Sequence, residues 1–280
     1  MRRIALRRRK IIIPAAVTIA AAAWVVWSNV SPEVTELTVE SEKLPESFSG
    51  FRIAQISDLH NAEFGSGNMK LVSLLEGAAP DIIVITGDMA DSRSTRIDIC
   101  LAFAEKCVQI APTFYVTGNH EARIDEYPEL AAGLEEAGVT VLDNSSAAVE
   151  RGGESISVIG VRDPAFTAGR ASSTVGSALA SLTGGDGYKI LLSHRPELFS
   201  TYVASGVDLV FAGHAHGGQV RLPVIGGLFV PGQGFFPEYD SGLYTSGTTR
   251  MIVSRGLGSS SFPVRINDRP EIVVAELISK

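Results

Sequence analysis

The five histidines of this chain each follow a short apolar run, and three such runs also deliver an acid or an amide. His214 and His216 are two residues apart, so on an extended backbone their side chains point the same way and can hold a common site. A single histidine is usually structural, but chance does not readily explain the whole set. The candidate site residues are Asp58, His60, Asp88, Asp91, Asn119, His120, His194, His214 and His216.

Imidazole, carboxylate and amide ligands, with no thiolate among them, indicate the kind of metal. This donor set suits manganese, iron, zinc or cobalt and argues against an iron–sulfur cluster or a structural zinc site. One ion cannot use four histidines, two aspartates and an asparagine. Sharing one carboxylate between two ions makes a dinuclear centre, with metals about 3.5–4 Å apart, which serves in-line displacement at phosphorus.

The first half of the chain contains the elements that must position these residues. Apolar runs predict buried strands over residues 53–56, 82–85 and 113–116, each followed by a helical pattern, over 69–75, 97–108 and 127–137. Such units connect by right-handed crossovers into a largely parallel sheet. Ligands bind beyond the carboxyl ends of parallel strands. That edge is where the predicted strands deliver Asp58, His60, Asp88, Asn119 and His120.

The second half of the chain begins with a predicted antiparallel segment and then again contains strands that end at histidines. Residues 139–141, 147–149 and 156–161 predict a short antiparallel run with turns at 143–144 and 152–153. A helix over 173–182 precedes strands over 190–193, which delivers His194, and 208–212, which delivers His214 and His216. Further strands are expected over 220–222, 228–230, 251–254 and 271–277, and an edge strand over 34–39.

The two cysteines are expected in the core. Cys100 and Cys107 lie on one face of the predicted 97–108 helix. Seven helical residues separate them by about 10 Å, which is too far for a disulfide.

The N-terminus is basic and then apolar. Six of the 24 basic residues precede Ile11, which leaves 18 basic against 31 acidic residues and a net charge of −13 for the rest. Residues 11–27 are uncharged and as a helix span roughly 25 Å, just enough for a membrane. Trp24 and Trp27 stand where interfacial aromatics belong, and the basic end is expected to stay in the cytoplasm.

Two interpretations of this segment remain open. A cleaved signal peptide would use the alanines at 21–23 as its cleavage site. An uncleaved anchor is favoured because the apolar run continues to Trp27, and either interpretation exports the remainder. The expected organisation is a basic cytoplasmic segment 1–10, an anchor or signal segment 11–28, a linker 29–50 and a catalytic domain 51–280.

Five sequence blocks together resemble the calcineurin-like metallophosphoesterase family. They are D-L-H, G-D-M-A-D, G-N-H-E, L-S-H-R-P and G-H-A-H, in the family's order between Ile53 and His216. The N-terminus and the G-H-A-H-G-G-Q continuation are similar to the membrane-anchored bacterial branch. The resemblance implies a four-layer α/β/β/α sandwich of two mixed β-sheets, here preceded by one transmembrane helix.

The resemblance also implies a role for each site residue. Asp58, His60 and His216 would hold one metal, Asn119, His194 and His214 the other, and Asp88 would bridge them. A hydroxide between the metals would attack phosphorus. His120, held by Asp91 or Glu121, would not bind metal; it is expected to protonate the leaving group, with charge stabilisation as the alternative.

The function expected from these observations is hydrolysis of a phosphodiester or lipid-linked phosphate outside the cytoplasmic membrane. A nuclease is disfavoured because residues 11–280, with a net charge of −13, would repel a polyanion. No nucleic-acid partner is therefore expected. A non-catalytic metal-stabilised binding domain would have no use for His120.

The apolar, glycine-rich stretch 228–236 either holds acyl chains or touches the bilayer, or is a hairpin packed on its own sheet. Arg162, Arg195 and Arg255 are as readily surface or salt-bridging residues as phosphate ligands.

Overall fold

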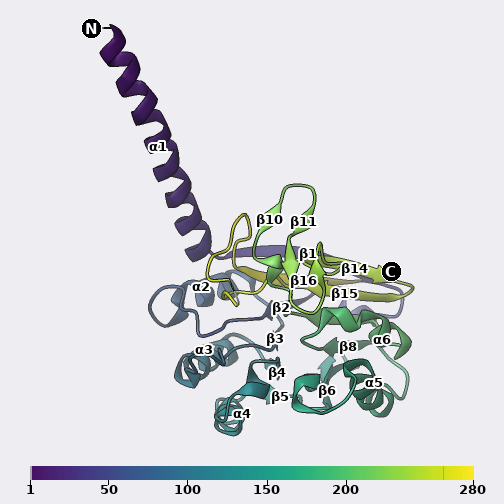
Figure 1. Cartoon of the computed structure of the whole chain (residues 1–280). Coiled ribbons are helices and arrows are strands. Elements are labelled where there is room, and N and C mark those ends of the chain that lie inside the picture. The colour runs from purple at the N-terminus through teal and green to yellow at the C-terminus, as the bar shows by residue number, and fades with distance from the viewer. Residues whose placement is uncertain (1, 261) are drawn as a thin grey trace.

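A long N-terminal helix stands apart from a layered domain (Figure 1). The computed structural model describes residues 2–260 and 262–280, with side chains from Ile13 onward. The side chains of the expected basic segment 1–10 therefore lie outside the described residues. Helix α1 spans Arg2–Val30, and Ile13–Val30 is long and apolar enough to cross a membrane while hardly any of it is buried. An anchor and a signal sequence both fit this finding.

The domain contains two mixed sheets, as the family resemblance implies, and each has six strands. The first has the order β1 (Glu33–Ser41), β16 (Glu271–Ser279), β2 (Phe51–Ile56), β3 (Ile82–Thr86), β4 (Thr113–Val116) and β5 (Thr140–Val141). The second has the order β14 (Gly242–Ser246), β15 (Thr249–Val253), β9 (Leu209–Ala212), β8 (Lys189–Leu192), β7 (Glu154–Gly160) and β6 (Ser145–Arg151). Strands β2, β3 and β4 pair in parallel, while β16 runs antiparallel to β2.

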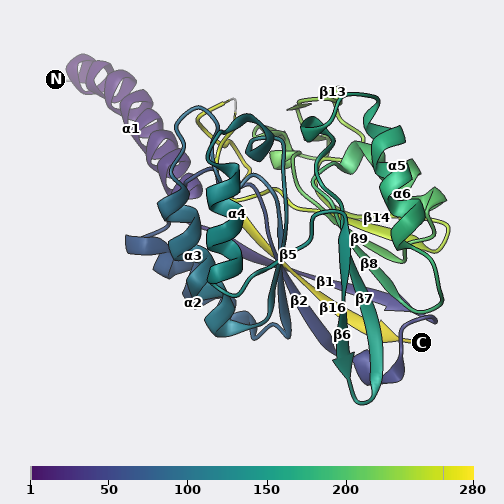
Figure 2. The same ribbon diagram turned by 90° about the horizontal axis from the view of Figure 1, so that it is seen from below.

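Helices cover the outer face of each sheet, which gives four layers (Figure 2). The first sheet carries α2 (Met69–Ala78), α3 (Ile97–Ile110) and α4 (Tyr127–Glu136), and the second carries α5 (Ala171–Leu182) and α6 (Phe199–Ala204). One-turn 3-10 helices occupy Glu46–Phe48, Ser66–Asn68, Glu121–Arg123, Pro164–Phe166, Pro196–Leu198 and His216–Gly218. Cys100 and Cys107 are free thiols on the buried face of α3, which confirms the prediction that they belong to the core.

The continuous apolar runs are explained by burial on both faces of a strand. In β3, Ile83 and Ile85 pack under the helices, whereas Ile82 and Val84 point between the sheets. Side chains alternate along a strand, so a strand covered on both sides has no polar face.

The structure corrects two of the expected elements. Strand β5 pairs in parallel with β4 and not antiparallel with β6, so residues 143–144 carry the chain from one sheet to the other. The expected linker 29–50 lies largely within the domain, since β1 pairs with β16 along its whole length and Val39 and Phe48 are buried between the sheets. As expected, β1 lies at an edge of its sheet.

The C-terminal part contains two small hairpins and two elements that the sequence pattern does not reveal. Strands β10 (Arg221–Leu222) and β11 (Gly226–Gly227) form one hairpin, and β12 (Phe229–Val230) and β13 (Gly234–Phe235) form the other, each separate from the main sheets. Strand β14 and helix α6 have no expected counterpart, because β14 is largely exposed and α6 is only six residues long.

Candidate metal centre

The loops after β2, β3, β4, β8 and β9 bring the seven expected ligands into one cluster. Each of these side chains belongs to a residue at most 7% exposed. Among the expected ligands, atoms within 4.8 Å of one another form two sets, Asp58, His60, Asp88 and His216 in one and Asp88, His194 and His214 in the other, and a third set joins His60 to Asp91 and His120. Asp88 is the member that the first two sets share.

In the first set, two imidazoles face each other beside carboxylates. The Nε2 atoms of His60 and His216 are 3.1 Å apart. Nε2 of His216 also lies 3.1 Å from Oδ1 of Asp58, and Nε2 of His60 lies 3.7 Å from Oδ2 of Asp88. Burial lowers the pKa of His60 to about 3, so its ring is neutral and offers a lone pair.

In the second set, a backbone carbonyl orients the ring of His194. Nδ1 of His194 donates to the carbonyl oxygen of Thr86 at 2.7 Å, so Nε2 faces the cluster, 3.2 Å from Oδ2 of Asp88. Orientation by such a carbonyl is typical of metal-binding histidines. Although burial lowers the pKa of His194, the charge of Asp88 raises it to about 10, so this position strongly favours positive charge.

Two polar atoms without an assigned hydrogen-bond partner test whether cations fit here. Within the described part of the chain, these are Nε2 of His194, which has the carboxylate of Asp88 beside it, and the buried Oδ1 of Asn119. Buried polar atoms are normally paired, so unpaired ones need an explanation. A divalent ion between these atoms and Asp88 would satisfy both. The donor set thus fits a His/Asp dimetal site.

The backbone around the cluster is strained and tightly packed. Left-handed φ angles occur at Asp58, His60, Asp88, His214 and His216. Such conformations cost energy for non-glycine residues and gather at functional sites. Gly118 is required for packing, since a Cβ there would lie 2.2 Å from Oδ1 of Asp88.

Glu121 supports the cluster from behind and does not hold His120. Its buried carboxylate accepts hydrogen bonds from the backbone N–H groups of Asp88 at 2.9 Å, Gly118 at 2.7 Å and Ala90 at 3.2 Å. Burial and the nearby charge of Asp88 raise the pKa of Glu121 to about 7. Glu121 therefore ties the loop after β3 to the loop after β4.

His120 lies beside Asp91, the first of the two partners that the sequence leaves open. Its Nδ1 accepts a hydrogen bond from the backbone N–H of Ser92 at 3.0 Å and lies 3.6 Å from Oδ1 of Asp91. The carboxylate of Asp91 is itself bound by Arg93. Because Nδ1 is an acceptor, the neutral ring of His120 carries its proton on Nε2. Burial lowers the pKa of His120 and favours this neutral form.

Of two arginines at the site, sequence reasoning left Arg195 uncommitted and did not consider Arg123. A cavity of about 240 Å³ is lined by Asp88, Asn119, His120, His214, Arg123 and Arg195. Asp163 holds Arg195 through contacts of 2.6 and 3.1 Å, and Nη1 of Arg195 lies 3.0 Å from Nε2 of His214. The position of Arg195 directly after His194 is the signal that could have identified it.

The other two arginines that the sequence singles out form ion pairs elsewhere. Arg162 pairs with Asp143, and Arg255 pairs with Glu33 and Glu271. Around the cavity, the site therefore combines a place for two cations, one N–H donor from an imidazole and two guanidinium groups. This combination suits a reaction in which negative charge develops on phosphoryl oxygens.

Comparison with known proteins agrees with this chemistry. The family model for calcineurin-like phosphoesterases matches residues 51–218. The metallophosphoesterase YkuE of Bacillus subtilis is 30% identical over 252 residues, which cover 88% of this chain and 86% of YkuE. The phosphodiesterase YaeI of Escherichia coli is 30% identical over 237 residues, covering 81% of this chain and 82% of YaeI.

Similarity also extends to a longer protein and to a crystal structure. A transmembrane protein with a metallophosphoesterase domain from Danio rerio is 33% identical over 86% of this chain, but the match covers 56% of that protein. The crystal structure of TT1561 from Thermus thermophilus superposes with a TM-score of 0.51 and 17% identity, covering 75% of this chain and 91% of TT1561. The latter similarity concerns the fold.

Proposed function

This chain belongs to the calcineurin-like phosphoesterase family, and from that membership we propose that it hydrolyses a phosphodiester or a lipid-linked phosphate outside the cytoplasmic membrane. It is a metal-dependent phosphoesterase with a buried His/Asp dimetal site. The proposal adds the type of ester, the roles of individual residues and the location.

We assign the metal ligands as two groups joined by one carboxylate. Asp58, His60 and His216 hold one ion, Asn119, His194 and His214 hold the second, and Asp88 bridges them. The ions, manganese, iron, zinc or cobalt, supply Lewis acidity toward water and toward the phosphoryl oxygens.

The remaining residues act on the substrate directly. Arg195, held by Asp163, and Arg123 orient the phosphoryl oxygens and offset their charge. His120 presents Nε2–H to the cavity, where it donates to an ester or phosphoryl oxygen, and Ser92 and Asp91 hold its ring. The single observation that carries the proposal is that two cation-binding sets share Asp88 in a cavity lined by these donors.

Two observations favour a diester over a monoester. A diester needs room for a second ester group beside the metal centre. Such room exists, since the metal-side cavity shares His216, Pro231 and Ser260 with a second cavity. The relative YaeI is described as a phosphodiesterase.

The test compares a diester with a monoester on protein of known metal content. Full-length protein would be stripped with a chelator, reloaded with Mn²⁺, Zn²⁺, Fe²⁺ or Co²⁺ and assayed on bis(p-nitrophenyl) phosphate and p-nitrophenyl phosphate. We expect about two ions per chain and faster hydrolysis of the diester. Turnover that persists without metal, or that is faster on the monoester, would contradict the proposal.

We propose that α1 is retained as an anchor with the domain outside. The six basic residues before Ile11 support a cytoplasmic N-terminus. Protease added to cells without an outer barrier should then cleave beyond Ser31 and leave a tag at residue 1 intact. A protected domain together with a cleaved tag would reverse the orientation.

A further inference from the structure

We propose that the apolar cavity beside the metal centre binds one acyl chain of a membrane lipid whose phosphoester lies between the metals. The inference rests on the proposed function and specifies its substrate class. It assigns the hairpins β10–β11 and β12–β13 a role in taking the lipid from the bilayer.

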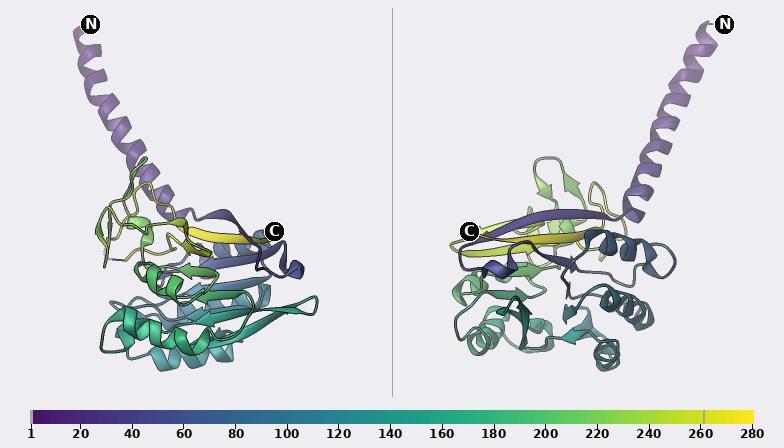
Figure 3. Two further views of the ribbon diagram at one scale, coloured as in Figure 1. Left: turned by 90° about the vertical axis from the view of Figure 1, so that its right-hand side faces the viewer. Right: turned by 180° about the vertical axis from the view of Figure 1, so that it is seen from behind.

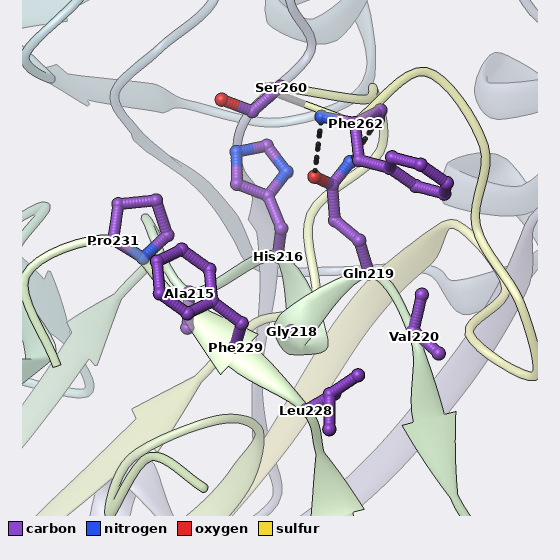
Figure 4. Close-up of a pocket in the computed structure, with 10 residues that line it drawn as sticks. All are labelled: Ala215, His216, Gly218, Gln219, Val220, Leu228, Phe229, Pro231, Ser260 and Phe262. Carbon is purple, nitrogen blue, oxygen red and sulfur yellow. Dashed lines mark hydrogen bonds between the residues drawn. The ribbon is translucent and has the colours of Figure 1, made fainter. Parts of the chain in front are cut away.

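The cavity has the size and lining of a site for a hydrocarbon chain. Its volume is about 300 Å³, at the lower end of the range for small-molecule sites. Val220 and Leu228 lie at one end, and His216 and Ser260 at the other (Figure 4). The polar groups of Gln219 are used internally, because its side chain exchanges hydrogen bonds of 2.7 and 3.1 Å with the backbone of Phe262. The described wall is consequently almost wholly apolar.

The cavity adjoins the metal centre. His216, an assigned ligand, lines both this cavity and the one that contains Asp88 and His120, as do Pro231 and Ser260. A phosphoester at the metals can therefore extend one substituent past His216 into the apolar space. Each methylene of the substituent that is transferred from water into this cavity increases the affinity of the substrate.

The cavity is rimmed by exposed apolar residues. Phe229 and Phe262 line it and are about half exposed, and Phe229 packs edge-on against the exposed Phe235. No charged residue occurs between Arg221 and Glu238. The turn of the β10–β11 hairpin exposes Val224 and Ile225. Exposed apolar patches of this kind mark sites that meet a membrane or a partner.

The position of α1 indicates that this face meets a bilayer. Helix α1 ends at Val30, and β1 begins at Glu33, so two residues separate the membrane-spanning segment from the first sheet. The side chain of Asn29 exchanges hydrogen bonds of 2.8 and 2.7 Å with the backbone of Arg265, which fixes the end of α1 on the domain. The β10–β11 hairpin rises on the same side as α1 in all views from the side (Figures 1 and 3). The occupant available at this face is thus a membrane lipid.

The experiment varies only the chain length of the substrate. Methyl, hexyl and dodecyl p-nitrophenyl phosphates share one leaving group and would be assayed below their micellar concentrations, using full-length Mn²⁺-loaded protein in an amphipathic polymer. Each fully buried methylene is worth about fourfold in affinity, so kcat/KM should rise at least tenfold from the methyl to the dodecyl ester.

Filling the cavity should remove this preference. In Val220→Trp, the dodecyl-to-methyl ratio of kcat/KM should fall below about threefold, because the indole occupies the space of the chain. Leu228→Trp fills the same space and replaces Val220→Trp in the test if that variant does not fold. The matched control is Leu243→Trp, an exposed apolar position in β14 away from the cavity, which should keep the wild-type ratio.

The outcomes separate this inference from the proposed function. No hydrolysis of any ester by the metal-loaded protein would overturn the proposed function. Hydrolysis of the methyl ester with no rise along the series would overturn the acyl site alone. A rise that both cavity variants retain, with metal content unchanged, would place the chain elsewhere and likewise overturn it.

Discussion

Replacing His120 by alanine should slow hydrolysis without removing metal. The hydrogen bond from Ser92 N–H to Nδ1 leaves this ring a single proton, on Nε2, and the residue is only 6% exposed. One preorganised donor in a site shielded from water is worth about 10²–10³ in kcat. We expect a loss of that size in His120→Ala, with two ions per chain retained.

The same hydrogen bond favours one of the two roles expected for His120. To protonate a leaving group, the ring must first carry a second proton on Nδ1, which faces the N–H of Ser92 and is disfavoured by the lowered pKa of His120. The geometry therefore favours the charge-stabilising role over the proton-donor role that the sequence led us to expect.

The assay uses two diesters that differ in their need for a proton. A nitrophenolate leaves readily without one, whereas an alkoxide does not. If His120 stabilises charge, His120→Ala should slow both substrates by similar factors, and His120→Gln, which keeps an N–H donor, should recover at least tenfold. A loss on the alkyl diester about a hundred times larger than on the nitrophenyl diester, with metals in place, would refute the argument from Ser92.

Three substitutions and one labelling experiment test other parts of the structure. Asp88→Asn should lower metal content and activity together because both cation sets share this carboxylate, while the exposed Asp186→Asn should change neither; two tightly bound ions and full activity in Asp88→Asn would exclude a bridging role. Glu121→Gln places an amide against three backbone donors and should cost about 1–3 kcal/mol of stability, seen as a lower Tm; an unchanged Tm would contradict its role in joining the two loops. Asn29→Ala removes two hydrogen bonds to Arg265 and should lower the free energy of unfolding by a similar amount, unless the end of α1 is not docked in solution. Burial raises the pKa of Cys107 to about 12, so the native protein should resist thiol reagents at pH 8 and react only after denaturation, and rapid labelling of native protein would show that α3 opens readily.

The clustering of the candidate site residues was largely predictable because these residues are adjacent in sequence to strands with an unambiguous pattern. A strand buried on both faces, such as Ile82–Thr86, is apolar throughout, and the polar residue that ends it must lie at the sheet edge. Arg195 and Glu121 were not assigned their roles, because those roles depend on contacts with other loops. Nothing in the local pattern says that Arg195 meets Asp163, 32 residues away.

The corrected elements differ from the expectations for a related reason. Strand β5 contains only two residues, and pairing of so short a segment is decided by the β4 strand beside it and not by its own alternation. The sequence of β1 is typical of an edge strand or a linker because six of its nine residues are polar, yet β1 gains nine paired positions from β16, which lies at the other end of the chain. Long-range partners of this kind leave no local signal.

The N-terminal helix and the metal centre are joined through one buried side chain. Asn29, in the last turn of α1, holds the backbone of Arg265, and the buried guanidinium of Arg265 contacts Asp268 at 3.0 Å and lies 3.4 Å from Nδ1 of His216. Trp27 adds a second attachment, since Arg269 lies 4.9 Å above its ring. A buried charge of this kind is kept in place only by its partners. The end of the apolar helix, the loop that borders the apolar cavity and the candidate ligand His216 are therefore connected by contacts, which link the candidate metal centre to the point where α1 meets the domain.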